Sequence, residues 1–161
     1  MVKYIGLLFI VSACFLTGIY LSLRLKFRFE FLSSFKGFMS NLETNIRFSS
    51  RDIFELIKAS APENISGIFG DERTEFYTYW ENTIKNIPSR YALKKEDLNL
   101  LAQFGHMLGT TDIEGQLNHI SLYKELIETN IENSKKELNE KSRLYKLLGL
   151  FAGIAAALLL I

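Results

Sequence analysis

Phe104-Gly-His-Met-Leu-Gly-Thr-Thr-Asp-Ile-Glu-Gly-Gln116 is the stretch that decides the fold, because it separates two helical patterns. Gly109 is expected to end the first helix, since glycine readily adopts the left-handed conformation that closes helices. Thr111, followed three residues later by Glu114, matches a capping box and is expected to begin the second helix. The sequence therefore predicts two helices joined by a short turn.

The helices on either side of this break follow from the spacing of their apolar residues. Before it, the apolar positions from Leu98 to Leu108 predict one helix face, on which Gly105 would let a neighbouring backbone come close. After it, the spacing predicts a helix of about 30 residues whose apolar stripe is regular up to Ile131. Residues 132–141 are almost wholly polar, which predicts a solvated helical stalk.

The first half of the chain is helical by the same criterion. Apolar residues from Phe27 to Ile46 mark a helix of about 20 residues, which we expect to continue from the apolar segment before it. Its many phenylalanines indicate a buried core face, with a binding groove as the alternative. Further on, the pattern is interrupted near Gly70, and Trp80 is expected to anchor the core of this half.

Two strongly apolar segments lie at the ends of the chain, and the first is long enough to cross a membrane. Tyr4 to Leu23 is uncharged, and about 20 such residues span a hydrocarbon core of about 30 Å as a helix. A cleaved signal peptide and a lipoprotein signal ending at Cys14 are the alternatives. The apolar segment continues past Cys14 and then meets Arg24, which favours an uncleaved anchor.

The second apolar segment, Leu147 to Ile161, is shorter. It rises only about 22 Å as a helix, so a full crossing needs Lys146 to extend toward the interface or the bilayer to thin locally. Gly149 and Gly153 form a Gly-x-x-x-Gly pair, which allows another helix to approach closely. The sequence leaves open whether copies of the chain also assemble into a homo-oligomer.

The positive charges predict the orientation. Basic residues follow the first span and precede the second: Arg24, Lys26, Arg28, Lys141, Arg143 and Lys146. The positive-inside rule then places the middle of the chain in the cytoplasm and both termini outside. The predicted fold is all-α: an N-terminal transmembrane anchor over 1–23, a cytoplasmic helical-bundle domain with its stalk over 24–146, and a C-terminal transmembrane helix over 147–161.

The residues that could carry chemistry are few. The net charge of +1 argues against a nucleic-acid binder. His106 and His119 have no cysteine or carboxylate at ligand spacing, so packing or solvated positions are expected for both. No nucleotide-binding loop, nucleophile elbow or metalloprotease helix appears. We expect no catalytic residue, no metal and no cofactor.

The order of these features resembles the stage III sporulation protein AB family of endospore-forming bacteria, which has an N-terminal anchor, a helical domain and a C-terminal membrane helix. The matching residues lie in the first soluble helix, at Trp80, around the break and at the start of the last span: Leu42, Glu43, Ile46, Trp80, Phe104, Gly105, Leu108, Gly109, Asp112, Gln116, Ile120, Leu147, Leu148 and Gly149. One departure is Asn45, where the resemblance implies a second acidic residue near Glu43.

The helical domain of that family is similar to the platform proteins of type II secretion and type IV pili. The resemblance implies a platform component of the channel between mother cell and forespore, in the mother-cell membrane that faces the forespore. Its implied partners are a secretion-type ATPase, the companion stage III sporulation protein AA, and other channel components. The Gly109 break would either move as the ATPase pushes the head or only fold the bundle. A platform outside sporulation and a general two-span scaffold are the alternatives.

Overall fold

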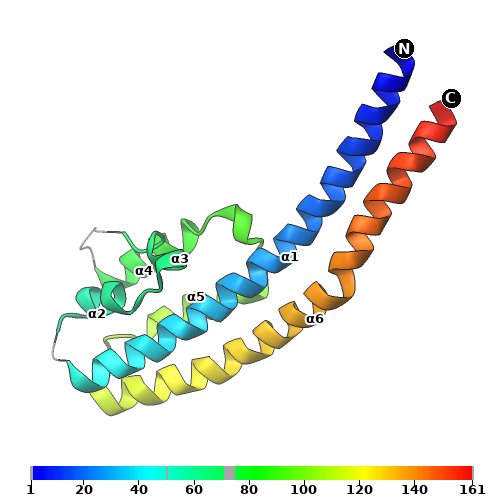
Figure 1. The fold of residues 1–161 in the computed structure, drawn as a ribbon. Helices are drawn as coiled ribbons and strands as arrows, with labels where there is room; N and C mark the ends of the chain where they lie inside the picture. The colour runs from blue at the N-terminus through cyan, green and yellow to red at the C-terminus, as the bar shows by residue number, and fades with distance from the viewer. Residues whose placement is uncertain (1, 50, 71–74, 161) are drawn as a thin grey trace. The chain divides into compact units, whose positions relative to one another are not determined.

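The computed structural model describes residues 2–49, 51–70 and 75–160, and their only regular secondary structure is helical (Figure 1). The all-α prediction is confirmed. Two long helices carry the ends of the chain, and shorter ones lie between them: α1 (Val2–Phe48), α2 (Ile53–Ser60), α3 (Glu63–Ser66), α4 (Phe76–Lys85), the 3-10 turn η1 (Ser89–Tyr91), α5 (Lys95–His106) and α6 (Ile113–Leu160).

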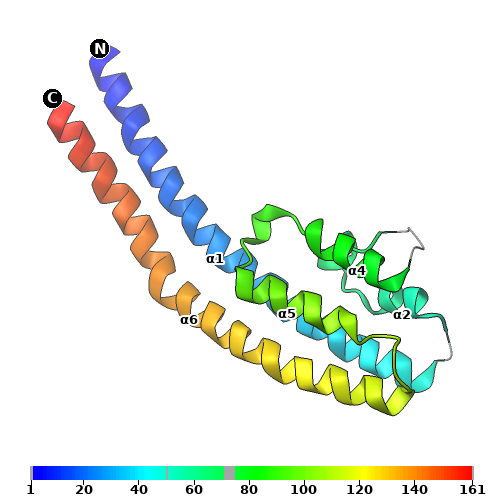
Figure 2. The same cartoon turned by 180° about the vertical axis from the view of Figure 1, so that it is seen from behind.

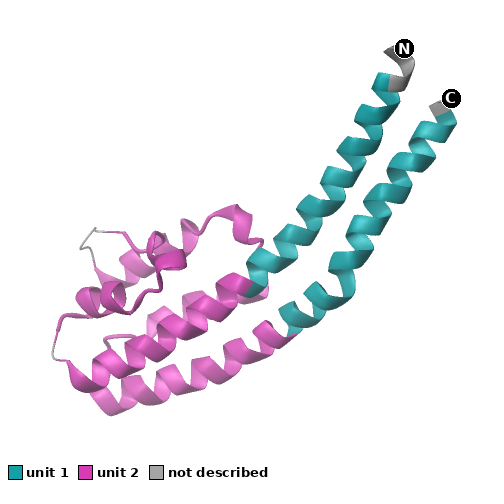
Figure 3. Ribbon diagram, in the orientation of Figure 1, with its two compact units in different colours: residues 1–29, 133–161 teal, residues 30–132 magenta. Residues whose placement is uncertain are grey.

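The chain divides into two compact units (Figure 3). Unit 1 contains residues 1–29 and 133–161, and unit 2 contains residues 30–132. Helices α1 and α6 each contribute to both units without a break in the helix. The expected continuity between the first apolar segment and the helix after it is therefore confirmed. The predicted membrane limits at 23 and 147 stay predictions.

Unit 2, which we call the head, is built around the apolar face of α1. The phenylalanines expected to form a core face are buried there, and Phe35 packs edge-on against Trp80 and Phe104. The side chains of the head with no exposed surface come from α1, α2, α5 and α6: Phe31, Leu32, Phe35, Phe38, Met39, Leu42, Ile57, Leu101, Phe104, Ile120 and Ile127. Burial of aromatic side chains on this scale makes packing the main source of head stability.

Within the head, α5 lies along those parts of α1 and α6 that belong to unit 2 (Figures 1 and 2). Helices α2, α3 and α4 form an outer layer on α1 and α5 (Figures 1 and 2). A network of amide and hydroxyl groups fixes α2 to α1. Asn41 donates to the Ser60 carbonyl at 3.1 Å and Asn45 to the Ser60 hydroxyl at 2.8 Å. The Ser60 hydroxyl in turn donates to the Leu56 carbonyl at 2.6 Å. A carboxylate at position 45 would have no proton to donate, which explains locally why an amide stands there.

Unit 1 consists of the two apolar ends of α1 and α6 with the residues next to them. The two helices run side by side, and both chain termini lie at the same end of the unit (Figures 1 and 2). Both helices are long and apolar enough to cross a membrane. Their large apolar side chains face outward rather than into a core, with Phe9 71%, Phe151 62% and Leu158 68% exposed. Such exposure is expected of a helix pair surrounded by lipid and is rare on soluble surfaces.

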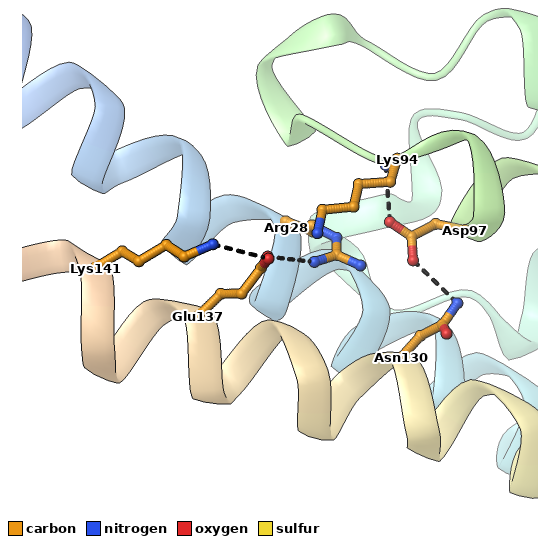
Figure 4. A network of polar contacts seen from close by, with 6 residues as sticks. All are labelled: Arg28, Lys94, Asp97, Asn130, Glu137 and Lys141. Carbon is orange, nitrogen blue, oxygen red and sulfur yellow. Dashed lines mark hydrogen bonds and ion pairs between the residues drawn. The ribbon is translucent and has the colours of Figure 1, made fainter.

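The segment expected to form a solvated stalk is exposed on most of its sides but has one partnered face in unit 1. Directly after this segment, Ser142 shares a hydrogen bond of 2.6 Å with Ser22 of α1. Glu137 accepts from Arg28 at 2.9 Å and from Lys141 at 3.2 Å (Figure 4). The Arg28 side chain is only 5% exposed. The polar sequence of this segment thus includes residues that pair with another helix, in addition to those that face water.

Candidate functional site

The break between α5 and α6 is a compact turn in the head. Helix α5 ends at His106, and Gly109, three residues later, has φ +77°. The left-handed conformation predicted for Gly109 is present, but within the turn rather than at the end of the helix. Thr110 closes the turn, because its hydroxyl donates to the Met107 carbonyl at 2.9 Å. The predicted helix end at Gly109 is wrong by three residues, since hydrogen bonds within the turn replace the last helical turn.

The capping box predicted at Thr111 and Glu114 is also wrong. Helix α6 begins at Ile113, and the carboxylate of Asp112 accepts a hydrogen bond of 3.0 Å from the Gly115 backbone amide. Asp112 is therefore the N-cap, and aspartate is among the best residues for this position. The Gln116 side chain donates to the Thr111 carbonyl at 2.9 Å, which fixes the turn from the other side. Asp112 and Gln116 thus both stabilise the start of α6.

Gly105 and Trp80 meet in the interior of the head. A Cβ atom added at Gly105 would overlap the indole ring of Trp80, at atoms Cγ, Cδ1 and Nε1. The expected close neighbour of Gly105 is present, but it is a side chain rather than a backbone. The Trp80 ring is fixed by its Nε1–H, which donates to the Leu101 carbonyl at 2.9 Å. Trp80 is 2% exposed, so it anchors the core between α4 and α5 as expected.

Leu42 and Glu43 point to different neighbours. Leu42 is fully buried in the core of the head. Glu43 accepts a hydrogen bond of 2.9 Å from Lys124 and so connects α1 to α6, with Arg47 at 3.7 Å on the same helix. The pair therefore acts in folding the head, through packing in one case and an ion pair in the other.

A shallow groove lies beside the turn. It has a volume of about 410 Å³, and its lining residues come from α1, α2, the turn and α6, among them Ile46, Ile53, Leu56, Gly109, Ile113 and Gln116. Leu108 is buried and lines a second groove on the other side of Gly109. Of the predicted positions, Leu108, Gly109, Asp112 and Gln116 are thus gathered at one end of the head. Whether they bind a partner stays a prediction.

Gly149 and Gly153 lie in unit 1, where their partner is α1. A Cβ at Gly149 would come within 2.7 Å of the Cys14 carbonyl oxygen and 3.1 Å of the Gly18 Cα. A Cβ at Gly153 would lie 3.0 Å from the Cα of Val11. The two apolar helices therefore approach each other closely through glycine, which is how helices associate in membranes. The other helix expected from the Gly-x-x-x-Gly pair belongs to the same chain.

The two histidines have packing roles. His119 stacks on Phe104, with its Nε2 2.8 Å from the Phe104 carbonyl oxygen. The exposed His106 ring lies 4.8 Å from that of Tyr77, between ring centroids. Among the described residues, no three His, Cys, Asp or Glu side chains form a group that could hold a metal ion.

Tyr77 belongs to a small exposed cluster on α4. Its hydroxyl donates to Glu81 at 2.9 Å, and this hydrogen bond and the negative charge raise the pKa of Tyr77. Lys85 donates to the same carboxylate at 2.9 Å, and this bond, followed by the one from Tyr77, lowers the pKa of Glu81. Near neutral pH Tyr77 therefore stays neutral and Glu81 stays ionised, and with Lys85 they form a surface hydrogen-bond chain.

Asp97 is a structural residue that sequence reasoning missed. Its carboxylate is fully buried and accepts from the Lys94 backbone amide at 2.8 Å and from Asn130 of α6 at 3.0 Å (Figure 4). It therefore caps α5 and connects that helix to α6. The spacing from Lys94 to Asp97 could have indicated the cap, but the contact with Asn130 exists only in the folded head.

Comparisons with known proteins cover nearly the whole chain. A family model described as stage III sporulation protein AB matches residues 3–161. The stage III sporulation protein AB of Bacillus subtilis (strain 168) is 26% identical over 172 residues, and 99% of each chain is covered. No solved structure matches the chain.

Proposed function

Because this chain belongs to the stage III sporulation protein AB family, as the sequence resemblance predicts, we propose that it is a non-enzymatic membrane platform of the channel between mother cell and forespore. Family membership supports a role in sporulation. It also favours this platform over a secretion or pilus platform outside sporulation. A cytoplasmic head that engages a secretion-type ATPase, the stage III sporulation protein AA, completes the proposal.

The distribution of charge supports a cytoplasmic head. Residues 1–29 and 133–161 contain nine lysines and arginines against two acidic residues, a net charge of +7. Eight of these basic residues lie between the two apolar segments, where the first helix leaves its span and the last helix enters its own. Basic residues are retained on the cytoplasmic side of membranes. The head then lies on the side where an ATPase has access to ATP.

The continuity of α1 and α6 is the observation that carries the platform role. Each helix contains an apolar segment suited to a membrane and also forms part of the head core. Within the head, the ion pair between Lys124 and Glu43 joins the two helices. Within unit 1, the ion pair between Arg28 and Glu137 joins them again. A force applied to the head therefore acts on both membrane helices at once.

The turn at Gly109 is assigned a structural role in this platform. Its hydrogen bonds from Thr110, Gly115 and Gln116 fix the path of the chain. The partners in these bonds all lie within the turn or the first turn of α6, so the bonds favour one conformation of the turn. The turn therefore folds the bundle, and the ATPase acts on the head as a whole.

Capture of the ATPase during sporulation tests this function. A tagged full-length chain is purified in detergent from the membranes of sporulating cells, and the ATPase is detected by immunoblot. An unrelated tagged two-span membrane protein, expressed at the same level, is the control. We expect the ATPase with this chain and not with the control. Full recovery of the chain without the ATPase, after cross-linking as well, would contradict the proposal.

A further inference from the structure

The head is strongly acidic although the whole chain is almost neutral. Residues 30–132 contain ten lysines and arginines and sixteen aspartates and glutamates, which gives a net charge of −6 against +1 for the whole chain. A protein domain with this charge attracts positively charged partners and speeds their association. A row of acidic residues without ion pairs, with exposed apolar side chains beside it, would suit such a partner.

One side of α6 in the head carries acidic residues without ion pairs. Glu114, Glu125 and Glu132 are exposed, and no ion pair joins any of them to the part of the chain that the structure describes. Glu125 lies about three helical turns after Glu114, and Glu132 lies about two turns after Glu125. The three side chains therefore form one row along α6. Two other charged residues of this segment pair with α1 instead, Lys124 with Glu43 and Glu128 with Lys36.

Two leucines are exposed beside this acidic row. Leu122 is 52% exposed and Leu126 44%, and they lie one turn apart on α6. In both ribbon views the side of α6 that faces away from α1 is not covered by another helix of the head (Figures 1 and 2). We call these five residues of α6 the acidic–leucine face: Glu114, Leu122, Glu125, Leu126 and Glu132.

We infer that the acidic–leucine face is the surface on which the ATPase docks, through lysines or arginines that lie beside apolar side chains. This inference rests on the proposed function and adds the location and chemistry of the contact. Opposite charges would guide the encounter, and burial of the two leucines would slow dissociation. In such a contact the two leucines would form the apolar centre and the glutamates the polar rim, which is the general arrangement of protein–protein interfaces.

The test measures binding of the purified ATPase to the full-length chain in lipid nanodiscs, where both sides are accessible. One variant neutralises the acidic row (Glu114→Gln, Glu125→Gln and Glu132→Gln), and a second removes the apolar pair (Leu122→Ser and Leu126→Ser). The matched acidic control is Glu63→Gln, Glu75→Gln and Glu96→Gln, three exposed residues elsewhere in the head. The matched apolar control is Phe48→Ser and Met107→Ser, which are 80% and 47% exposed.

We expect each α6 variant to weaken binding about tenfold or more, as loss of interface charges and anchors does, and each control to bind like the parent chain. The acidic variant should also lose most of the salt dependence of binding. Circular dichroism shows whether every variant keeps its helical content.

Four outcomes would overturn the inference. If the parent chain binds and the folded α6 variants bind equally well, the ATPase docks elsewhere and the proposed function stands. If the controls weaken binding as much as the α6 variants, the attraction is diffuse rather than local. If the α6 variants instead change the mass of the assembly without ATPase, a second copy of the chain covers this face. A parent chain that does not bind the ATPase would overturn the proposed function as well.

Discussion

The indole ring of Trp80 fills the space that a side chain at Gly105 would need, so these two residues fix the distance between α4 and α5. The ring is held by its hydrogen bond to the Leu101 carbonyl and by edge-on contact with Phe104. Gly105 is the second-to-last residue of α5, and a glycine in a helix loses more conformational freedom on folding than other residues do. Here that cost is offset, because the missing side chain lets the largest residue of the head enter the core.

Replacement of Gly105 by alanine tests this relationship. The added methyl group must displace Trp80, and overpacking of this kind destabilises proteins by about 1–3 kcal/mol. The chain has a single tryptophan, so urea unfolding followed by its fluorescence reports on the same site. The control is Gly37→Ala in α1, where a Cβ would meet no atom within 4 Å. Equal midpoints for Gly105→Ala and the control would contradict the predicted clash.

Replacement of Asp112 by alanine tests the start of α6. The variant loses the hydrogen bond to the Gly115 amide, and loss of an N-cap costs about 0.5–2 kcal/mol. Thr111→Ala is the matched control, because Thr111 contributes its backbone carbonyl to Gln116 and this group remains in the variant. Thermal melting of both proteins distinguishes the two caps. A larger loss for Thr111→Ala would restore the capping box predicted from the sequence.

Replacement of Glu137 by leucine tests the ion pair in unit 1. It removes the carboxylate that the buried Arg28 contacts at 2.9 Å, and breaking a buried pair costs about 3–5 kcal/mol. The double variant Arg28→Met with Glu137→Leu should recover much of this loss, because the buried charge of Arg28 is removed together with its partner, and Lys141, which also loses Glu137, is 43% exposed. Melting temperatures in detergent micelles are compared with that of Glu140→Leu, an exposed acid of the same helix. A double variant no more stable than Glu137→Leu would argue against this pairing.

Local patterns in the sequence predicted the helices and the turn. Apolar spacing was sufficient for α1 and its phenylalanine face, and a single glycine indicated the left-handed turn at Gly109. The start of α6 was missed by two residues, because Thr111 and Asp112 are adjacent and both are good N-caps. Only the folded head shows that the carboxylate of Asp112 reaches the Gly115 amide.

The polar contacts between helices could not be predicted from one sequence. Asp97 and Asn130 are 33 residues apart, and Arg28 and Glu137 are 109 apart. Apolar periodicity shows which face of a helix is buried, but it does not show which polar residue of another helix lies opposite. A charged residue in a polar segment, such as Glu137, is therefore predicted to be solvated when its partner is not known. The stalk prediction overlooked this pair for that reason.

The side of the membrane on which the head lies is the central claim, because an ATPase partner requires a cytoplasmic head. Asn99 is exposed on α5, so Asn99→Cys together with Cys14→Ser places a single thiol on the head. Intact sporulating cells are treated with a membrane-impermeant thiol reagent, and labelling is compared before and after lysis. We predict protection in intact cells and full labelling after lysis. Labelling of the Asn99→Cys variant in intact cells would place the head outside and contradict the account.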